Sequence, residues 1–184
     1  MKFSSLIVPF ALVASVAASG LLKRDTSGCC CGCLAQSAAE SIVDQYISIL
    51  THTNVTTANA TAQALLDENY TEISDSILSL EGLPLGNATF VGKQEYINGV
   101  LNSPPVEGVN TLEVLVAGCT KILWYWLFTG IGSGEYEVKG FNLFTLSDVG
   151  QISVVNLEFN SIAWGLDTGY QIVFPPNGSA PTRN

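Results

Sequence analysis

Residues 138–159 read VKGFNLFTLSDVGQISVVNLEF, and this stretch decides the fold class. It predicts two β-strands joined by a tight turn at Asp148-Val149-Gly150, because strand-forming residues stand on both sides of a turn sequence. Apolar residues occupy both faces over much of each strand, so we expect a sheet that is covered twice. For the function of the chain, it matters what covers each face and whether one face holds a ligand.

Two stretches upstream predict further strands of this sheet, because apolar residues alternate in them. Leu112, Val114 and Val116 share one face of the first stretch. The second reads ILWYWLF over residues 122–128, with Ile122, Trp124, Trp126 and Phe128 on one face and Leu123, Tyr125 and Leu127 on the other. Together with residues 138–159 they give a four-strand antiparallel run. Glycines between the strands allow strong curvature.

The chain before residue 105 predicts three helices. Residues 34–50 form the first, residues 60–68 the second and residues 93–101 the third. Residues 69–86 predict mostly loop, with at most a short strand. The first helix has one apolar face, formed by Ala35, Ala39, Ile42, Val43, Tyr46, Ile49 and Leu50. Helices followed by strands indicate an α+β fold, with three N-terminal helices packed on a strongly curved antiparallel sheet.

The first 24 residues predict secretion. A basic start at Lys2, an apolar run over residues 6–18 and small residues after it are typical of a signal peptide, which we place at residues 1–19. Residues 20–24 end in Lys23-Arg24, a dibasic pair that would make them a short propeptide. The alternative is a membrane anchor, but this run is too short to span a bilayer. We therefore expect a secreted, extracellular protein without membrane contact after signal removal.

Five sequons predict glycosylation behind this signal peptide, and a used sequon must lie at the surface. They begin at Asn54, Asn59, Asn69, Asn87 and Asn177.

Net charge excludes one class of partner. Residues 1–24 hold three of the seven basic residues and no acid, so four basic and 16 acidic residues give the remaining chain a net charge of −12. Such a chain repels phosphate backbones and anionic lipid. We expect neither nucleic acid nor a membrane surface as a partner.

The cysteines predict a disulfide. Cys29, Cys30, Cys31 and Cys33 lie in a Cys-rich segment over residues 25–33, and Cys119 lies near a predicted strand end. Closing the long loop between Cys33 and Cys119 would stabilise the domain by a few kcal/mol in the chain-entropy model, so we predict this pair. Five cysteines leave one that is unpaired or paired between chains. A thiolate metal site is the alternative, but three consecutive cysteines lack the spacing of zinc sites, and we predict no metal.

The order of these elements resembles a known superfamily. Together with the strand, Asp-x-Gly turn and strand of residues 138–159, it is similar to the nuclear transport factor 2-like (NTF2-like) superfamily, whose α+β fold is a cone. Residues 69–105, NYTEISDSILSLEGLPLGNATFVGKQEYINGVLNSPP, resemble small secreted fungal members. The resemblance covers residues 34–164 and implies a domain over residues 34–167, followed by a tail over residues 168–184. It also implies that the helices and one sheet face enclose a conical cavity.

The superfamily includes enzymes and many members without activity, so the fold alone does not give a function. Residues 43–50, VDQYISIL, resemble the first helix of ketosteroid isomerases, where a Tyr at the position of Tyr46 donates a hydrogen bond to the substrate oxygen. Asp75 lies in the region of their general base, near Asp67, Glu68 and Glu72. The resemblance thus implies Tyr46 and Asp75 as catalytic candidates. Related dehydratases pair His with Asp, whereas His52, the one histidine here, lies in a predicted loop.

Each candidate also has a structural interpretation. Tyr46 can be a core phenol, and Asp75 can cap nearby amides. Trp124, Trp126 and Phe128 can fill a core or, with Tyr46, line a pocket for a small apolar ligand. No nucleophile, phosphate-loop or cofactor motif is present, so we expect no cofactor. Two hypotheses stay open: a binding protein without catalysis for such a ligand or an extracellular partner, and a cofactor-independent acid/base isomerase or lyase.

The second face of the sheet predicts a homodimer. Leu123, Tyr125 and Leu127 point away from the predicted cone, and no further helical layer covers them. A contiguous apolar patch of this kind tends to mark an interface, and the resemblance implies that a second subunit often packs on this face. The alternative cover is residues 170–174, YQIVF, folded back over it.

Overall fold

The computed structural model describes residues 33–171. Within this range none of the helices is long and apolar enough to cross a membrane. The elements are, in chain order, α1 (Gln36–Leu50), α2 (Val55–Leu65), β1 (Leu66–Ile73), α3 (Asp75–Glu81), β2 (Ala88–Val91), α4 (Lys93–Leu101), β3 (Glu107–Ala117), β4 (Lys121–Gly130), β5 (Val138–Leu146), β6 (Ile152–Phe159) and α5 (Ser161–Asp167).

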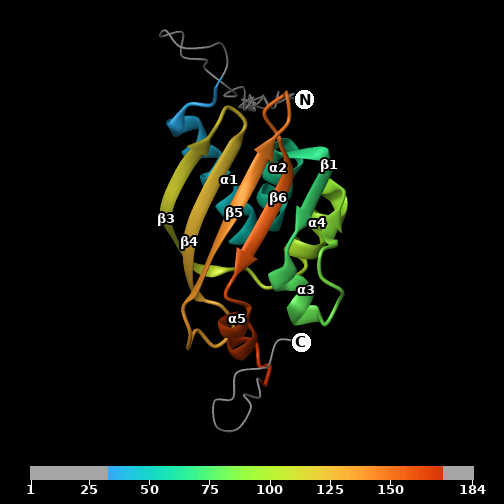
Figure 1. Ribbon diagram of the computed structural model, residues 1–184, viewed down its shortest axis with the longest axis vertical. Helices are drawn as coiled ribbons and strands as arrows, with labels where there is room; N and C mark the ends of the chain where they lie inside the picture. The colour runs from blue at the N-terminus through green and yellow to red at the C-terminus, as the bar shows by residue number, and fades with distance from the viewer. Residues whose placement is uncertain (1–32, 172–184) are drawn as a thin grey trace, which may run out of the picture.

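The strands form one curved sheet in the order β2-β1-β6-β5-β4-β3 (Figure 1). Residues 138–159 form β5, a turn and β6, as predicted, and the turn is closed by a 2.8 Å hydrogen bond from the Ser147 N–H to the Gln151 carbonyl. The antiparallel run from β3 to β6 is also as predicted. The sheet is larger than expected, because β1 adds to β6 in parallel and β2 pairs with β1.

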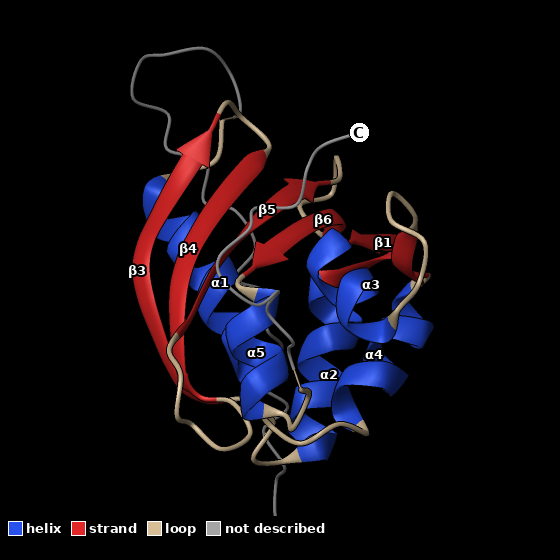
Figure 2. Cartoon of the chain, turned by 60° about the horizontal axis from the view of Figure 1, so that its bottom comes forward, coloured by secondary structure: helices blue, strands red, loops and turns tan. Residues whose placement is uncertain are grey.

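The helices cover the concave face of this sheet. Helix α1 lies against β3, α4 lies against β1, and α2 packs on both helices. Helices α3 and α5 pack against each other at one end of the molecule, where Figure 2 shows them beside the curled strands. The fold is the α+β cone expected from the sequence.

Helix α1 shows why the pattern in residues 34–50 was informative. Its buried residues are Ala39, Ile42, Val43, Tyr46 and Ile49, all from the predicted apolar face. Helix α4 has the predicted bounds.

The second helix differs from its prediction. Helix α2 begins earlier than residue 60, because the Asn54 side chain caps it by accepting a 3.0 Å hydrogen bond from the Thr57 N–H. It ends at Leu65, because Leu66 pairs with Ile152 of β6 and starts β1. Tertiary pairing therefore decides the conformation of residues 66–68.

The predicted disulfide is present, linking Cys33 to Cys119. Beside it, the Leu34 N–H donates a 3.3 Å hydrogen bond to the Cys119 carbonyl, so the start of α1 is tied to the turn between β3 and β4. The predicted signal peptide, the predicted propeptide, Cys29, Cys30, Cys31 and Asn177 fall outside the described residues.

Candidate functional site

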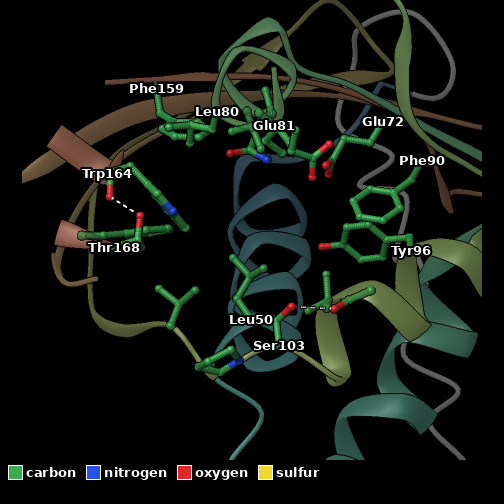
Figure 3. Close-up of a pocket in the computed structure, with 18 of the residues that line it drawn as sticks. Leu50, Glu72, Leu80, Glu81, Phe90, Tyr96, Ser103, Phe159, Trp164 and Thr168 are labelled. Atoms are coloured by element: carbon green, nitrogen blue, oxygen red, sulfur yellow. Dashed lines mark hydrogen bonds between the residues drawn. The ribbon is translucent and has the colours of Figure 1, made fainter. Parts of the chain in front are cut away.

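A cavity of about 450 Å³ lies between the concave face of the sheet and the helices (Figure 3). Most of its wall is apolar, and the larger side chains in it are Phe90, Trp126, Phe128, Leu157, Phe159 and Trp164. Glu72 and Tyr96 lie on one side of the cavity and Trp164 and Thr168 on the opposite side. Glu72 and Tyr96 thus form a polar group on one side of a mainly apolar space.

The centre of this polar part is Glu72, whose side chain is 2% exposed. Its Oε2 accepts hydrogen bonds from the Tyr70 hydroxyl at 3.0 Å and from the Tyr46 hydroxyl at 3.4 Å. The Tyr96 hydroxyl donates in turn to the Tyr46 oxygen at 2.7 Å. The other carboxylate oxygen, Oε1, has one long contact, 3.5 Å from the Thr89 hydroxyl. That oxygen keeps most of its capacity to accept hydrogen bonds.

Three elements bring these groups together. Tyr46 comes from the buried face of α1 and Tyr96 from that of α4, while Tyr70 and Glu72 are two residues apart on β1 and so share a face. The ring centroids of Tyr70 and Tyr96 are 4.7 Å apart, and those of Tyr46 and Phe144 are 4.9 Å apart. Ring packing therefore fixes the phenols so that their hydroxyls converge on one carboxyl group.

Burial sets the charge of this cluster. It raises the pKa of Glu72 to about 7, although the hydrogen bonds from Tyr70 and Tyr46 favour the ionised carboxylate and limit the shift. Burial, reinforced by the negative charge of Glu72, also raises the pKa of Tyr46 and of Tyr70 well above the usual value. The phenols stay neutral donors at physiological pH, whereas Glu72 exists in both protonation states.

A second polar group in the cavity wall is Asn142 on β5, which is 2% exposed. Its Oδ1 accepts a 2.7 Å hydrogen bond from the Trp126 indole N–H. Because an indole N–H can only donate, this bond fixes which end of the amide is oxygen. No residue of the described chain accepts from the amide Nδ2, and this nitrogen is not among the fully enclosed unpartnered atoms. Asn142 thus offers N–H donors to the cavity.

Gly140 allows Trp126 to take this position. A Cβ atom at residue 140 would lie 2.5 Å from the Trp126 Cζ2 and 2.6 Å from the Phe159 Cβ, too close for either contact. Without it, the indole lies across β5 and stacks on Phe128 with a centroid distance of 3.8 Å. The glycine is therefore needed for the shape of the cavity wall.

The aromatic residues singled out in the sequence separate into two groups. Tyr46, Trp126 and Phe128 line the cavity. Trp124 points from the same face of β4 but is fully buried beside the cavity, where its indole N–H donates a 3.0 Å hydrogen bond to the Thr111 hydroxyl.

Asp75 is not part of the cavity wall, and this corrects the sequence-based pairing with Tyr46. It opens α3, and its Oδ1 accepts a 2.7 Å hydrogen bond from the Gly86 N–H in the following loop. The carboxyl group that faces Tyr46 belongs to Glu72, three residues earlier. The alternation of Tyr70, Glu72 and Ser74 would have indicated this, had residues 66–73 been recognised as a strand.

The remaining ionisable candidates also lie outside the cavity wall. Asp67 accepts a 2.9 Å hydrogen bond from the Asn69 N–H, and Glu68 forms an ion pair with Lys93. His52 is buried in the turn after α1, with its ring nitrogens 3.1 Å from the carbonyl oxygens of Ile49 and Ser103. Over residues 33–171, no three His, Cys, Asp or Glu side chains gather in a group that could hold a metal.

The structure describes four of the five sequons. Asn54 caps the start of α2, Asn59 is on α2, Asn69 is on β1, and Asn87 is in the loop between α3 and β2. Asn54, Asn69 and Asn87 are exposed, and Asn59 is half-buried. None of these four lies on β3, β4 or β5.

Comparison with solved structures shows the same fold in several proteins. A steroid delta-isomerase from Pseudomonas aeruginosa is 15% identical, with a TM-score of 0.51, and the match covers 74% of this chain and 91% of that chain. An NTF2-like protein of unknown function from Burkholderia pseudomallei K96243 is 13% identical, with a TM-score of 0.54 and coverage of 74% and 99%. A SnoaL-like protein of unknown function from Burkholderia thailandensis E264 is 11% identical, with a TM-score of 0.52 and coverage of 69% and 98%. At these identities the likeness concerns the fold alone.

No curated protein matches the chain by sequence. The family profile for the NTF2-like domain matches residues 32–171, which is most of the chain and includes every residue of the cavity. The chain therefore belongs to the NTF2-like domain family.

Proposed function

We propose that this protein binds a small, largely apolar molecule in the cone and holds a polar group of that molecule at Glu72 and Asn142. The observation that carries the proposal is the placement of these two buried polar side chains, each with unused hydrogen-bonding capacity, in the wall of a mainly apolar cavity. A volume of about 450 Å³ lies within the range of ligand pockets.

The polar groups narrow the chemistry of the ligand. Glu72 Oε1 can accept a hydrogen bond from a hydroxyl group, and the Asn142 amide can donate one to a carbonyl or hydroxyl oxygen. An anionic ligand would meet the Glu72 carboxylate in a desolvated space, which costs energy. We therefore expect a neutral ligand with a hydroxyl or carbonyl group at one end.

The proposal includes where the protein binds its ligand, which we place outside the cell. A signal peptide over residues 1–19 would send the chain into an oxidising compartment, where the Cys33–Cys119 disulfide can persist. The exposed sequon residues Asn54, Asn69 and Asn87 would carry glycans there. On this proposal the protein takes up its ligand outside the cell.

A matched pair of probes tests the binding function. Naphthalene and 2-naphthol have the same apolar body, and 2-naphthol adds one hydroxyl. Measured by isothermal titration calorimetry, wild-type protein should bind 2-naphthol about tenfold more tightly than naphthalene, since a hydrogen bond to a charged group contributes about 1.5 kcal/mol or more. The Glu72→Gln variant should lose most of this preference, and Asp75→Asn should keep it. Equal binding of both probes by wild-type protein, or no binding, would reject the proposal.

The raised pKa of Glu72 also favours a second candidate function, which is the catalysis of proton transfer next to a carbonyl group. A general base works best with a pKa near the working pH, and burial raises the pKa of Glu72 to about 7. The Glu72 carboxylate would take a proton from the α-carbon, the Asn142 amide would hold the enolate oxygen, and Glu72 would return the proton at the γ-carbon. In this candidate Glu72 takes the role that the resemblance to ketosteroid isomerases implied for Asp75.

The test substrate for this candidate is a β,γ-unsaturated 3-ketosteroid, and its conversion to the conjugated ketone is followed by absorbance. If the candidate holds, Glu72→Gln lowers the rate by about 100-fold or more, whereas Asp75→Asn leaves it near wild type. If wild-type protein converts the substrate no faster than buffer does, the steroid isomerase candidate is rejected. The proposed binding function is not affected by that result.

A further inference from the structure

Trp164 differs from the other two tryptophans of the chain in the partner of its indole N–H. The Trp124 N–H donates to the Thr111 hydroxyl at 3.0 Å, and the Trp126 N–H donates to the Asn142 oxygen at 2.7 Å. In the described part of the chain nothing accepts from the Trp164 N–H, although this half-buried side chain lines the cavity. Its nitrogen is not among the fully enclosed unpartnered atoms, so it borders open space.

Contacts at both ends of α5 hold the Trp164 indole in place. At the start of the helix, the Asn160 N–H donates a 3.0 Å hydrogen bond to a carbonyl of β5. At its end, the Asp167 carboxylate accepts a 2.7 Å hydrogen bond from the Ser133 hydroxyl. The indole packs on Phe159 of β6 with a centroid distance of 5.0 Å. Figure 3 shows it extending from α5 toward the interior of the cavity, so the donor is positioned before any ligand binds.

The other polar side chains at this end of the cavity do not offer a similar donor. The Thr168 hydroxyl donates its proton to the Trp164 carbonyl at 2.9 Å. Tyr170 is 52% exposed, and Glu81 is exposed as well and, when ionised, can only accept. The Trp164 N–H is therefore the donor that a molecule filling this end would remove from water.

The two ends of the cavity differ in the hydrogen bonds that they offer. Trp164 and Thr168 lie on the side opposite Glu72 and Tyr96 (Figure 3). Glu72 Oε1 can accept from a ligand, whereas the Trp164 indole can only donate to one. We propose that Trp164 is a second polar contact for the ligand. The ligand is then an elongated neutral molecule with a hydroxyl at the Glu72 end and an acceptor oxygen, such as a ketone, at the Trp164 end.

This inference rests on the proposed binding function and adds the length, polarity and orientation of the ligand. A ligand that is apolar at the Trp164 end would cover the indole N–H without giving it an acceptor, and an unpaired donor that is taken out of water costs binding free energy. A ketone at the same place forms the missing hydrogen bond. Trp164 therefore selects among ligands that bind equally well at Glu72.

A first test needs no ligand. The indole N–H signals of the three tryptophans are assigned by their loss in Trp→Phe variants, and their exchange in D₂O is followed by NMR. The Trp164 N–H should exchange about tenfold or more faster than those of Trp124 and Trp126, because these two are buried and hydrogen-bonded. Exchange of the Trp164 N–H as slow as theirs would show that it already has an acceptor, and this overturns the proposal.

The second test uses matched probes and isothermal titration calorimetry. Two rigid bodies of different length, 2-naphthol and 4-phenylphenol, each carry an acetyl or an isopropyl group at the end away from the hydroxyl. The two groups have similar size, but only acetyl has an acceptor oxygen. In at least one series, Trp164→Phe should lower the ratio of acetyl to isopropyl affinity about fivefold, because both probes lose the same ring contact and only one loses a hydrogen bond.

Trp124→Phe is the matched control. It removes an indole that lies outside the cavity wall, so it should leave the acetyl-to-isopropyl ratio near that of wild type. A ratio that Trp164→Phe leaves unchanged in both series overturns the proposal. So does an equal fall in Trp124→Phe, which would assign the change to a general loss of packing.

The readouts separate this proposal from the proposed function. If the preference for 2-naphthol over naphthalene depends on Glu72 but the acetyl-to-isopropyl ratio does not depend on Trp164, the proposed function stands and the Trp164 contact is rejected. If the ratio depends on Trp164 but no preference depends on Glu72, the Trp164 contact stands and the proposed contact at Glu72 is rejected. Absence of binding by every probe rejects both.

Discussion

The Glu72 carboxyl group is buried, so its ionisation costs free energy. The hydrogen bonds that it accepts offset only part of that cost. Its Oε2 receives two phenol donors, while Oε1 has one contact of 3.5 Å. In the folded protein the pKa of Glu72 is therefore raised to about 7. In the unfolded chain the same group loses its proton near its ordinary pKa, so the folded and unfolded states differ in protonation between about pH 4 and 7.

The raised pKa of Glu72 makes the folded protein less stable as pH rises. Between the two pKa values the folded state holds one proton more than the unfolded state, so the contribution of Glu72 to stability falls as pH rises through this window. The free energy of unfolding should change by about 2–4 kcal/mol from this group alone. Glu72→Gln carries no such charge and should gain stability relative to wild type by that amount between pH 4 and pH 8.

Urea unfolding of wild-type and variant proteins at pH 4, 6 and 8 measures this difference. Asp148→Asn removes one exposed carboxyl group from the turn between β5 and β6 and is the control for the loss of an acid outside the cavity. A difference between Glu72→Gln and wild type that does not change with pH would show that Glu72 titrates normally in the fold.

Among the elements, β5 and β6 were predictable from sequence and β1 was not. In β5 and β6 local preference and burial agree at Val138, Phe144, Ile152 and Val155, which are β-branched or aromatic residues that the sheet buries. In β1 they disagree, because LDENYTEI places Glu72 at an inward position that sequence patterns assign to apolar residues. The residues of the candidate site therefore also differ in how well the sequence predicts them. Tyr46 follows from the apolar face of α1, whereas Glu72 required the pairing of β1 with β6, which joins segments far apart in the chain.

Helix α3 was hidden for a related reason. Ser74 caps it by accepting a 3.1 Å hydrogen bond from the Ile77 N–H, but its first turn is also held by Glu158 of β6. The Glu158 carboxylate accepts from the Asp75 N–H at 2.9 Å and from the Ser76 N–H at 3.1 Å. A seven-residue helix stabilised by a side chain 82 positions away leaves a weak local signal.

Substitution of Gly140 on β5 tests whether this glycine is needed for the shape of the cavity wall. Gly140→Ala places a Cβ atom against Trp126 and Phe159, so the indole must move. We expect a loss of about 1–3 kcal/mol in the free energy of unfolding, as for other overpacked cores, together with weaker 2-naphthol binding. Gly118→Ala, in the turn between β3 and β4, adds strain at φ 69° but meets no atom within 4 Å, and it should leave binding unchanged. Unchanged stability and binding in Gly140→Ala would show that Trp126 can repack freely.

At the scale of the whole molecule, the convex face of the sheet remains without a cover among the described elements. Leu115 pairs with Leu123 and Tyr125 with Phe141 across β3, β4 and β5, and Leu115, Tyr125 and Phe141 are 38–44% exposed. No sequon from Asn54 to Asn87 lies on these strands. This face also carries Lys121 and Lys139, two of the three basic residues between residues 33 and 171. It is thus largely apolar and free of those sequons, with Glu113 as an acidic neighbour opposite Tyr125.

We expect this face to pair with its own copy in a homodimer, as the sequence suggested, because a contiguous exposed apolar patch tends to mark an interface. Light scattering of deglycosylated wild-type protein at micromolar concentration should give twice the monomer mass. Tyr125→Asp should give a monomer, because it buries a charge in the interface. Val91→Asp, on an exposed position of β2 at the far edge of the sheet, should remain a dimer. A monomeric wild-type protein contradicts the prediction.

The central claim is that a ligand in the cone places a polar group against Glu72. The most direct measurement is the ¹³C chemical shift of the Glu72 side-chain carboxyl carbon as a function of pH, assigned by its absence in Glu72→Gln. We predict a titration midpoint near 7 in the free protein and a lower midpoint with saturating 2-naphthol, because a hydroxyl donor favours the ionised carboxylate. Naphthalene has no donor and should not lower it. A midpoint that saturating 2-naphthol leaves unchanged would contradict the account.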